Sequence, residues 1–304
     1  MAGITIIGTG SYAPGEPVPN AALSRVMDTT DEWIRQRTGI HQRHYVEDGV
    51  GVSDLGKEAA ERAIAAAGID RGEIDYIIFA TMTPEHLFPG SGGILGAKLG
   101  IERVPALDIR QQCAAMPYSL QLANGLVASK AARTVLIVGA DAHAGFMPWK
   151  AWDVVRGRSD RAVPPEEFAF ASEHRGMAVL FGDGAGAMIV REASEGRGYL
   201  GSKLHTDGRI FQSIYIPLGF TSLPYVSQRT VDEAAHIPRM KGQDLFKTAV
   251  KELSSAVRAL CSQAGVEVDD VDWFVAHQAN DRINDAVRQA LKLPPEKVPS
   301  NIAR

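Results

Sequence analysis

The sequence contains few cysteines and no long apolar run. Only two of its 304 residues are cysteine, Cys113 and Cys261, and they lie far apart. This number and spacing predict neither a disulfide framework nor a metal site, so a reducing cytoplasm is the expected location. No apolar run approaches the ~20 residues that a membrane span needs, and the N-terminus lacks the basic region of a signal peptide. We therefore expect no membrane insertion and no bound metal.

The sequence also lacks a strong excess of either charge. The formal net charge is −4, from 32 lysines and arginines against 36 aspartates and glutamates, without any block of five like charges. A nucleic-acid partner is therefore not expected. The hydrophobic content of 45% over this length is enough for one large core or two packed half-domains.

Strand-like apolar runs alternate with helical segments along the chain. Strands are predicted at 4–7, 75–81 and 134–141, a helix at 53–67, and two strands around a glycine-rich turn within 175–190. This alternation predicts a largely parallel sheet covered on both faces. Residues 8–13 match the G-x-G-x-x-A pattern of dinucleotide sites. Three prolines follow at once, however, so no helix N-terminus can bind a pyrophosphate there.

Cys113 occupies a junction between a predicted strand, 104–109, and a predicted helix, 116–130. Pro117 fits this placement, because proline is accepted in the first turn of a helix. Unpaired N–H groups and the helix dipole favour a thiolate at such a position, and a thiolate is a far better nucleophile than a thiol. The alternative interpretation is a small hydrophobic residue buried in a turn.

The second half of the sequence echoes the first. Residues 68–81 correspond to 265–278, and 104–110 correspond to 298–304. Two copies of one α/β unit, related by a pseudo-twofold axis, would explain this repeat. The first copy continues into a helix and a strand, whereas nothing follows Arg304. We therefore expect the chain to be cut short there.

His277 follows a predicted strand, 271–276, in the second copy. Ligand sites of open α/β sheets form at the carboxyl ends of strands. The twofold axis would bring His277 toward Cys113, and such a pair can act as nucleophile and proton partner. The alternative is a structural histidine.

Two further segments are rich in aromatic residues. Trp33 is interleaved with two arginines, Arg35 and Arg37, and such a set can hold a flat base and a phosphate. A helix end with Gly39 as C-cap explains the same residues. Segment 143–174 includes Trp149 and Trp152, which would share one face of a helical turn. We expect this segment to form a lid or wall over a substrate channel, with a purely structural dimer prop as the alternative.

Several motifs together point to one family. They are residues 31–40 around Trp33 and Arg37, the Cys113 turn, Arg175 with Gly176, the run from Phe181 to Gly186, residues 204–208, and residues 277–283. With them the sequence, from Ile4 to Arg304, resembles β-ketoacyl-acyl-carrier-protein synthase III of the thiolase superfamily. The resemblance implies an α/β thiolase fold with two pseudo-twofold-related halves in a five-layer αβαβα arrangement. The halves would be 1–175, with Cys113, and 176–304, with His277 and incomplete.

The resemblance also implies the reaction. Cys113 would take an acyl group from acyl-coenzyme A as a thioester, and His277 would assist the decarboxylating condensation with malonyl-acyl carrier protein. Trp33 and Arg175 would hold the adenine of coenzyme A, and Arg37 would lie near its phosphates. Ala279 and Asn280 would contact the pantetheine arm, and Gly176 and Phe181 would contact other parts of the coenzyme. Phe88 would line the acyl pocket near a dimer interface, and Arg282 would bind the acyl carrier protein. Coenzyme A is then a substrate, no cofactor is tightly bound, and a homodimer is expected.

The sequence departs from the family pattern in places. Residues 114–116 are Ala-Ala-Met where the family usually has small-Gly-Phe, and segment 143–174 is longer than usual. The run His-Leu-Phe-Pro at 86–89 argues against the branch that condenses two acyl chains head to head. The family's third catalytic residue, an asparagine, would follow Arg304.

Two other functions stay open. One is a thiolase-fold acyltransferase that moves an acyl group to an oxygen or nitrogen acceptor without condensation. The other is a non-catalytic partner subunit, against which the presence of both Cys113 and His277 argues.

Overall fold

The computed structural model describes residues 3–194 and 196–303, and Arg304, the last residue of the predicted second copy, lies outside them. The chain forms two compact units, each assembled from separate stretches of sequence. Unit 1 comprises Met1–Glu16, His44–Ala144 and Gly182–Leu204, and unit 2 comprises Pro17–Arg43, Gly145–Phe181 and His205–Arg304. The halves 1–175 and 176–304, which the repeat predicts, stay a prediction.

Unit 1 is a five-stranded sheet with helices on both faces. Its elements are β1 (Ile4–Tyr12), α3 (Val52–Ala67), η1 (Arg71–Glu73), β4 (Tyr76–Ala80), α4 (Ser91–Leu99), β5 (Ala106–Ile109), η2 (Gln112–Ala114), α5 (Ala115–Ala128), β6 (Thr134–Asp141) and β7 (Gly184–Glu192), with η3 (His143–Phe146) at its border. The strands predicted at 75–81 and 134–141 and the helices predicted at 53–67 and 116–130 are confirmed within two residues at each end.

The sheet is mixed rather than largely parallel. Its strand order is β1-β7-β6-β4-β5, in which β4 pairs parallel with β5 and β6. Strand β7 runs antiparallel to both β6 and β1. The parallel prediction is wrong for this side, because β7 begins beside the end of β6, with Gly184 opposite Asp141, and returns in the opposite direction.

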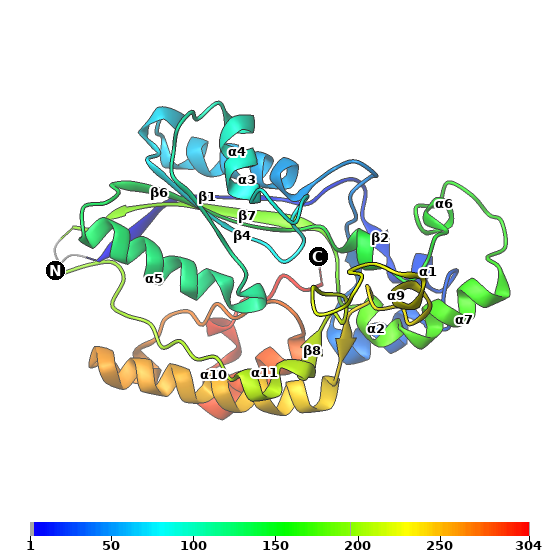
Figure 1. Cartoon of the computed structure of the whole chain (residues 1–304). Helices are drawn as coiled ribbons and strands as arrows, with labels where there is room; N and C mark the ends of the chain where they lie inside the picture. The colour runs from blue at the N-terminus through cyan, green and yellow to red at the C-terminus, as the bar shows by residue number, and fades with distance from the viewer. Residues whose placement is uncertain (1–2, 195, 304) are drawn as a thin grey trace. The chain divides into compact units, whose positions relative to one another are not determined.

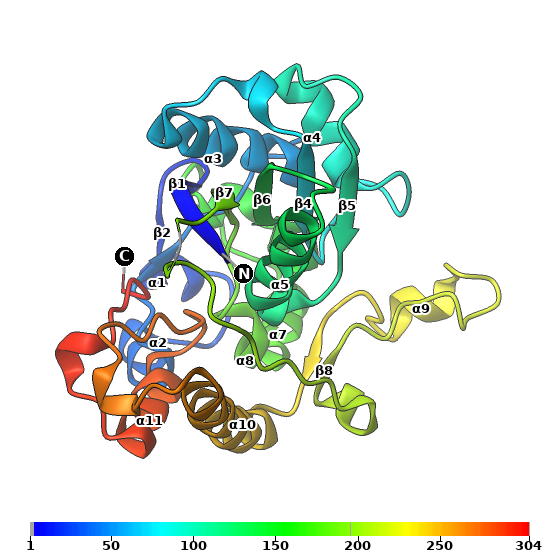
Figure 2. The same ribbon diagram turned by 90° about the vertical axis from the view of Figure 1, so that its left-hand side faces the viewer.

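Helices cover the two faces of this sheet. Helices α3 and α4 lie on one face and α5 on the other (Figures 1 and 2). The first face is packed by a cluster that includes Leu55, Phe79 and Leu136, and the second by one that includes Ile78 and Val127. The strands β4 and β6 are buried on both sides, as an apolar run without alternation predicts.

The glycines of the dinucleotide-like pattern serve helix packing. Residues 8–12 continue strand β1 and do not turn into a helix. A Cβ atom on Gly8 would overlap the carbonyl oxygen of Ala63, and one on Gly10 that of Ala59, both in α3. The two glycines therefore let α3 lie close against β1. This geometry agrees with the prediction that residues 8–13 do not form a phosphate-binding loop.

Unit 2 is mainly helical. Its elements are β2 (Val18–Pro19), α1 (Asn20–Leu23), α2 (Asp31–Thr38), β3 (Gln42–Arg43), α6 (Trp152–Val155), α7 (Pro165–Glu173), α8 (Arg175–Ala178), η4 (Gly208–Ser213), β8 (Ile214–Tyr215), α9 (Gln228–Asp232), β9 (Arg239–Met240), α10 (Gly242–Ala264), η5 (Val268–Asp270), α11 (Asp281–Leu291) and η6 (Pro295–Lys297). Helix α10 packs against α11 around the buried side chains of Val287, Leu291 and Leu293.

Two strand predictions are wrong. Residues 175–178 form the helix α8, because the carbonyl of His174 accepts hydrogen bonds from the N–H groups of Met177 and Ala178. Residues 271–276 form no strand, because a strand needs a partner along its length. One backbone bond, from Phe274 N to Lys297 O at 2.8 Å, joins this segment to the residues near η6.

Among residues 3–194 and 196–303, no helix is long and apolar enough to cross a membrane.

Candidate functional site

Cys113 lies between strand β5 and helix α5, as predicted, within the short helix η2. Its side chain is exposed. The preceding residue, Gln112, has a φ of 44°, which is the left-handed region that side chains disfavour. Such a conformation costs about 1–2 kcal/mol and persists where the surroundings impose it. The sharp turn presents Cys113 ahead of the first turn of α5.

The thiol of Cys113 is not activated by its surroundings. Although Cys113 reaches the surface, desolvation by the surrounding protein raises the pKa of its thiol. The carboxylate of Asp141 raises this pKa further, and a backbone hydrogen bond lowers it by less. The prediction that this position favours a thiolate is therefore wrong, because desolvation and a neighbouring negative charge outweigh the helix terminus. Cys113 rests as a protonated thiol and needs a base in order to act as a nucleophile.

Asp141 is fixed at the end of β6. Its Oδ1 atom accepts hydrogen bonds from Thr81 Oγ1 at 3.1 Å, Met82 N at 2.8 Å and Thr83 Oγ1 at 3.1 Å. These donors hold the carboxylate in place at the carboxyl end of β4. No pattern in the sequence had singled out Asp141, since its effect on Cys113 depends on the neighbouring strand.

His277 lies in the irregular segment before α11, in unit 2, and its side chain is exposed. Although the ring reaches the surface, burial by the surrounding protein lowers its pKa. The imidazole is therefore neutral near pH 7 and can accept a proton. Cys113 belongs to unit 1, so the prediction that the two residues act together stays a prediction.

The guanidinium groups of two arginines lie close to the ring of Trp33. The Cζ atom of Arg37 lies 4.3 Å from the centroid of the Trp33 ring, and that of Arg175 lies 4.9 Å from it. Arg175 also forms hydrogen bonds with Asp28, through the backbone oxygen at 2.5 Å and the carboxylate at 3.1 Å. Helix α2 presents Trp33 because it is capped by Thr30, whose hydroxyl accepts a bond from Trp33 N, and by Gly39 at its C-terminus.

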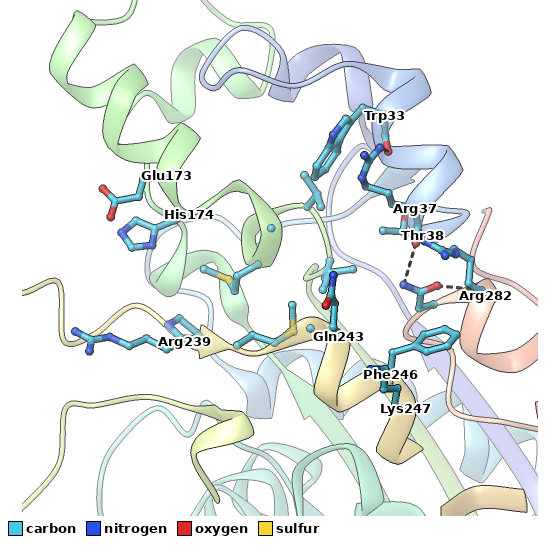
Figure 3. A pocket seen from close by; sticks show the side chains of 18 residues that line it. Trp33, Arg37, Thr38, Glu173, His174, Arg239, Gln243, Phe246, Lys247 and Arg282 are labelled. Atoms are coloured by element: carbon cyan, nitrogen blue, oxygen red, sulfur yellow. Dashed lines mark hydrogen bonds between the residues drawn. The ribbon is translucent and has the colours of Figure 1, made fainter. Parts of the chain in front are cut away.

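This ring stands at one side of a cavity of about 690 Å³ in unit 2 (Figure 3). Four cationic side chains line it, together with one carboxylate and a histidine whose pKa is lowered by burial. The cations are Arg37, Arg239, Lys247 and Arg282, and the last two groups are Glu173 and His174. An excess of positive charge beside an indole ring suits a ligand with an aromatic base and phosphates.

Asn280 has a structural task in this cavity. It is the N-cap of α11, and its Oδ1 atom accepts a hydrogen bond from Arg282 N at 2.9 Å. Its Nδ2 atom donates to the carbonyl oxygen of Arg37 at 3.0 Å. Asn280 thus ties α11 to the end of α2 and aligns Arg282 with Arg37 in one wall.

Some of the residues predicted to bind coenzyme A or acyl carrier protein line this cavity. Its lining includes Trp33, Arg37, Gly176, Asn280 and Arg282. Ala279 and Phe181 are not among the lining residues, and Phe88 lies in unit 1 with 84% of its side chain exposed.

Sequence reasoning missed Arg239, Gln243, Phe246 and Lys247, which line the cavity as well. The amphipathic pattern of α10 was the one signal that could have pointed to Lys247, since that helix carries it on its first turns.

The segment 143–174 folds as two short helices, α6 and α7. Trp149 is buried and its ring centroid lies 5.5 Å from that of Trp152. The two rings are in contact, but the prediction that they share one face of a helical turn is wrong, because α6 begins at Trp152. Phe170, in α7, is exposed. Arg25, after α1, donates to the carbonyl oxygens of Val154 and Ser159, which fastens the segment within unit 2. Its role as a lid stays a prediction.

In residues 3–194 and 196–303, histidine, cysteine, aspartate and glutamate side chains form no group of three that could hold a metal ion.

Two family models match the sequence. The model described as 3-oxoacyl-[acyl-carrier-protein (ACP)] synthase III matches residues 107–160 and 168–208, and the C-terminal model of this synthase matches residues 261–304. The β-ketoacyl-[acyl-carrier-protein] synthase III of Rhizorhabdus wittichii is 40% identical over 294 residues, which are 96% of this chain and 82% of that protein. The protein of the same name from Ruegeria pomeroyi is 38% identical and is matched over 98% of this chain and 84% of its own length.

Solved structures resemble this one over nearly its whole length. The 3-oxoacyl-[acyl-carrier-protein] synthase III of Aquifex aeolicus is 31% identical with a TM-score of 0.82, covering 99% of this chain and 85% of its own. The priming β-ketosynthase of the R1128 polyketide pathway is 28% identical with a TM-score of 0.81, covering 99% and 81%. These structures confirm the predicted α/β thiolase fold.

Proposed function

This chain belongs to the 3-oxoacyl-[acyl-carrier-protein] synthase III family, and from that premise we propose that it condenses an acyl group from acyl-coenzyme A with malonyl-acyl carrier protein, with loss of CO₂. The coenzyme A thioester is a substrate, and the reaction needs no tightly bound cofactor. We assign the enzyme to the acyltransferases and place it in the cytoplasm. The observation that carries the proposal is the cationic cavity beside Trp33, which fits the nucleotide end of coenzyme A.

Cys113 is the proposed acyl acceptor. A base takes the proton of the Cys113 thiol, the sulfur attacks the thioester carbonyl carbon, and coenzyme A leaves as its thiolate. His277 is the proposed base, since its lowered pKa keeps the imidazole neutral and able to accept that proton. In the second half-reaction, malonyl loses CO₂, the resulting carbanion attacks the acyl-Cys113 carbonyl, and the Cys113 thiolate leaves.

The cavity in unit 2 supports recognition of the nucleotide. A base sandwiched between Trp33 and Arg175 needs two stacking distances, together roughly 7 Å. The guanidinium of Arg175 lies only 4.9 Å from the Trp33 ring. Arg175 must therefore move off the ring, which means releasing Asp28, before a base can stack there. Arg37 then lies beside the same ring to meet a phosphate.

Other residues complete the proposed substrate contacts. Arg282, whose guanidinium lies 5.9 Å from the Phe246 ring, and Lys247 are placed on one cavity and offer positive charge to the acidic surface of acyl carrier protein. Ala279 and Asn280 are proposed for the pantetheine arm. Phe88 is proposed for the acyl pocket near the interface of a homodimer.

Two measurements test this function. Release of labelled CO₂ from malonyl-acyl carrier protein, dependent on acyl-coenzyme A, distinguishes condensation from acyl transfer to an oxygen or nitrogen acceptor. An acyl adduct on Cys113, detected by intact mass, distinguishes both enzymes from a non-catalytic partner subunit. We expect both signals, and an adduct without CO₂ release would favour the acyltransferase instead.

A further inference from the structure

The loop between β4 and α4 presents two large apolar side chains to solvent. Leu87 is 61% exposed and Phe88 is 84% exposed, and they are neighbours at its tip. Both flanks of this loop are buried, since Thr81 and Ser91 are 5% and 0% exposed. Adjacent exposed apolar side chains on an otherwise anchored loop are typical of a contact that the tip makes with something else.

Carboxylates fix both ends of the loop. Asp141 accepts three hydrogen bonds from residues 81–83 at the end of β4. Asp108 accepts bonds from Ser91 N at 2.6 Å and Gly92 N at 2.9 Å at the start of α4. These hydrogen bonds lie at residues 81–83 and 91–92, on either side of the tip.

Glu85 holds the loop two residues before Leu87. Its Oε1 atom accepts a hydrogen bond from Ser53 N at 2.6 Å, and its Oε2 atom accepts one from Ser91 Oγ at 2.5 Å. Both serines are fully buried, Ser53 in α3 and Ser91 in α4. The one carboxylate therefore joins the loop to two helices of the sheet's packed face.

Glu85 is partly buried and lies close against the residue before α3. A Cβ atom on Gly51, the residue before α3, would overlap Cγ of Glu85. Burial tends to raise the pKa of Glu85, but the donors on Ser53 and Ser91 outweigh it and bring the pKa below its usual value. Glu85 is thus an ionised side chain with both oxygens engaged and little room to reorient.

We propose that Glu85 is the positioning residue that fixes the Leu87–Phe88 tip and thereby sets which acyl chain lengths the condensation accepts. This inference rests on the proposed function, in which Phe88 belongs to the acyl pocket. Without the hydrogen bonds of Glu85, the Leu87–Phe88 tip can take several positions, and the volume of the acyl pocket then varies. The enzyme should then discriminate less between longer and shorter acyl primers. Selectivity changes because a pocket discriminates by the volume that its walls leave.

Three substitutions at one position test this role. Glu85→Ala removes both hydrogen bonds, and Glu85→Asp shortens the reach by about 1.5 Å, so it cannot span both serines. Glu85→Gln can accept from Ser53 N and donate to Ser91 Oγ, so it retains the shape and both contacts. Glu102→Ala is the matched control, because Glu102 is an exposed acid of the same unit.

The first measurement is kcat/KM over a series of straight-chain acyl-coenzyme A primers. We expect Glu85→Ala and Glu85→Asp to change the ratio between the best and the longest primer by roughly tenfold, and Glu85→Gln and Glu102→Ala to leave it unchanged. Adding Glu85→Ala to Phe88→Ala should shift the ratio no further, because the tip side chain is already absent. A uniform loss for all primers, with an unchanged ratio, would show a structural role only and overturn the proposal.

The second measurement is amide hydrogen exchange. Glu85→Ala should speed exchange in residues 82–90 and at Ser53, and Glu85→Gln should not. Unchanged exchange in Glu85→Ala would also overturn the proposal. A wild-type protein that forms no acyl adduct refutes the proposed function and the selectivity with it, whereas an acylated protein with an unchanged ratio refutes the role of Glu85 alone.

Discussion

The helices α3 and α10 precede the two copies of the internal repeat, yet they bury their side chains very differently. Helix α3 buries seven of its 16 residues, whereas α10 buries none of its 23, although both are amphipathic. Helix α3 packs on the sheet of unit 1, whereas α10 packs mainly on the helix α11, with smaller contacts to η4 and η5. Periodicity thus indicates which face a helix can bury, and the neighbouring layer decides how much of it is buried.

The segments after these helices differ in the same way. Ile78 lies in β4 and is 0% exposed, whereas Val275, at the matching position of the repeat, is 69% exposed. Matching apolar residues of the two copies should therefore contribute differently to the free energy of unfolding. The four predictions that follow are ordered by the size of the expected effect, and the second of them tests this difference directly.

The two cysteines of the chain should differ most. We expect Cys113→Ser to abolish acylation by acyl-coenzyme A, because an alcohol is a far weaker nucleophile at neutral pH. Cys261→Ser, in α10, should leave the adduct at its full yield. Intact mass spectrometry measures both variants. An adduct that survives Cys113→Ser and disappears with Cys261→Ser would reverse the assignment.

The matching apolar residues should differ next. We expect Ile78→Ala to lower the free energy of unfolding by about 2–5 kcal/mol, as for other large-to-small changes in a packed core. Val275→Ala should change it by no more than about 0.5 kcal/mol, because its side chain is exposed. Urea denaturation followed by fluorescence measures both. An equal loss for the two variants would mean that Val275 is covered in solution, and the contrast between the copies would fail.

A substitution in the cavity of unit 2 should weaken the binding of acyl-coenzyme A. We expect Trp33→Ala to raise KM for acyl-coenzyme A by roughly tenfold, from the loss of about 1–2 kcal/mol of stacking. Trp273→Ala, which removes a tryptophan that is 64% exposed, serves as the control and should leave KM near the wild-type value. Steady-state kinetics would measure the two. A comparable rise in KM for both variants would contradict the assignment of Trp33 to the coenzyme.

The smallest effect concerns the charge beside Cys113. Asp141→Asn keeps the oxygen that accepts from residues 81–83 and removes the negative charge, so the pKa of Cys113 should fall. At a fixed pH near neutrality, more thiolate is then present, and alkylation by iodoacetamide should be faster. Glu102→Gln removes an exposed charge as the control. A rate that is unchanged, or slower, in Asp141→Asn would show that the carboxylate does not act on the thiol.

Much of unit 1 could be predicted from the sequence, because its strands and helices are long and apolar enough to be recognised alone. The junction at Cys113 followed from the same pattern. The direction of β7 could not be predicted, since it depends on where the chain returns after segment 145–181. The strand at 271–276 was predicted wrongly because an apolar run shows a tendency and not a partner.

The candidate site was predicted in part for similar reasons. Trp33, Arg37 and Arg282 belong to recognisable motifs, and the structure brings them to one cavity. The pKa of Cys113 was predicted in the wrong direction because Asp141 acts from a neighbouring strand. Lys247 and Arg239 lie far from any motif in the sequence, and only the folding of unit 2 brings them to the cavity that Trp33 also lines.

The protonated state of Cys113 has a consequence for the lifetime of the enzyme. Peroxides oxidise thiolates and react slowly with thiols, so an exposed cysteine with a raised pKa resists conversion to sulfenic and sulfinic acid. The carboxylate of Asp141 thus protects the sulfur that it makes less reactive. With Cys113 as the proposed acyl acceptor, we expect peroxide to inactivate the protein slowly in the absence of substrate.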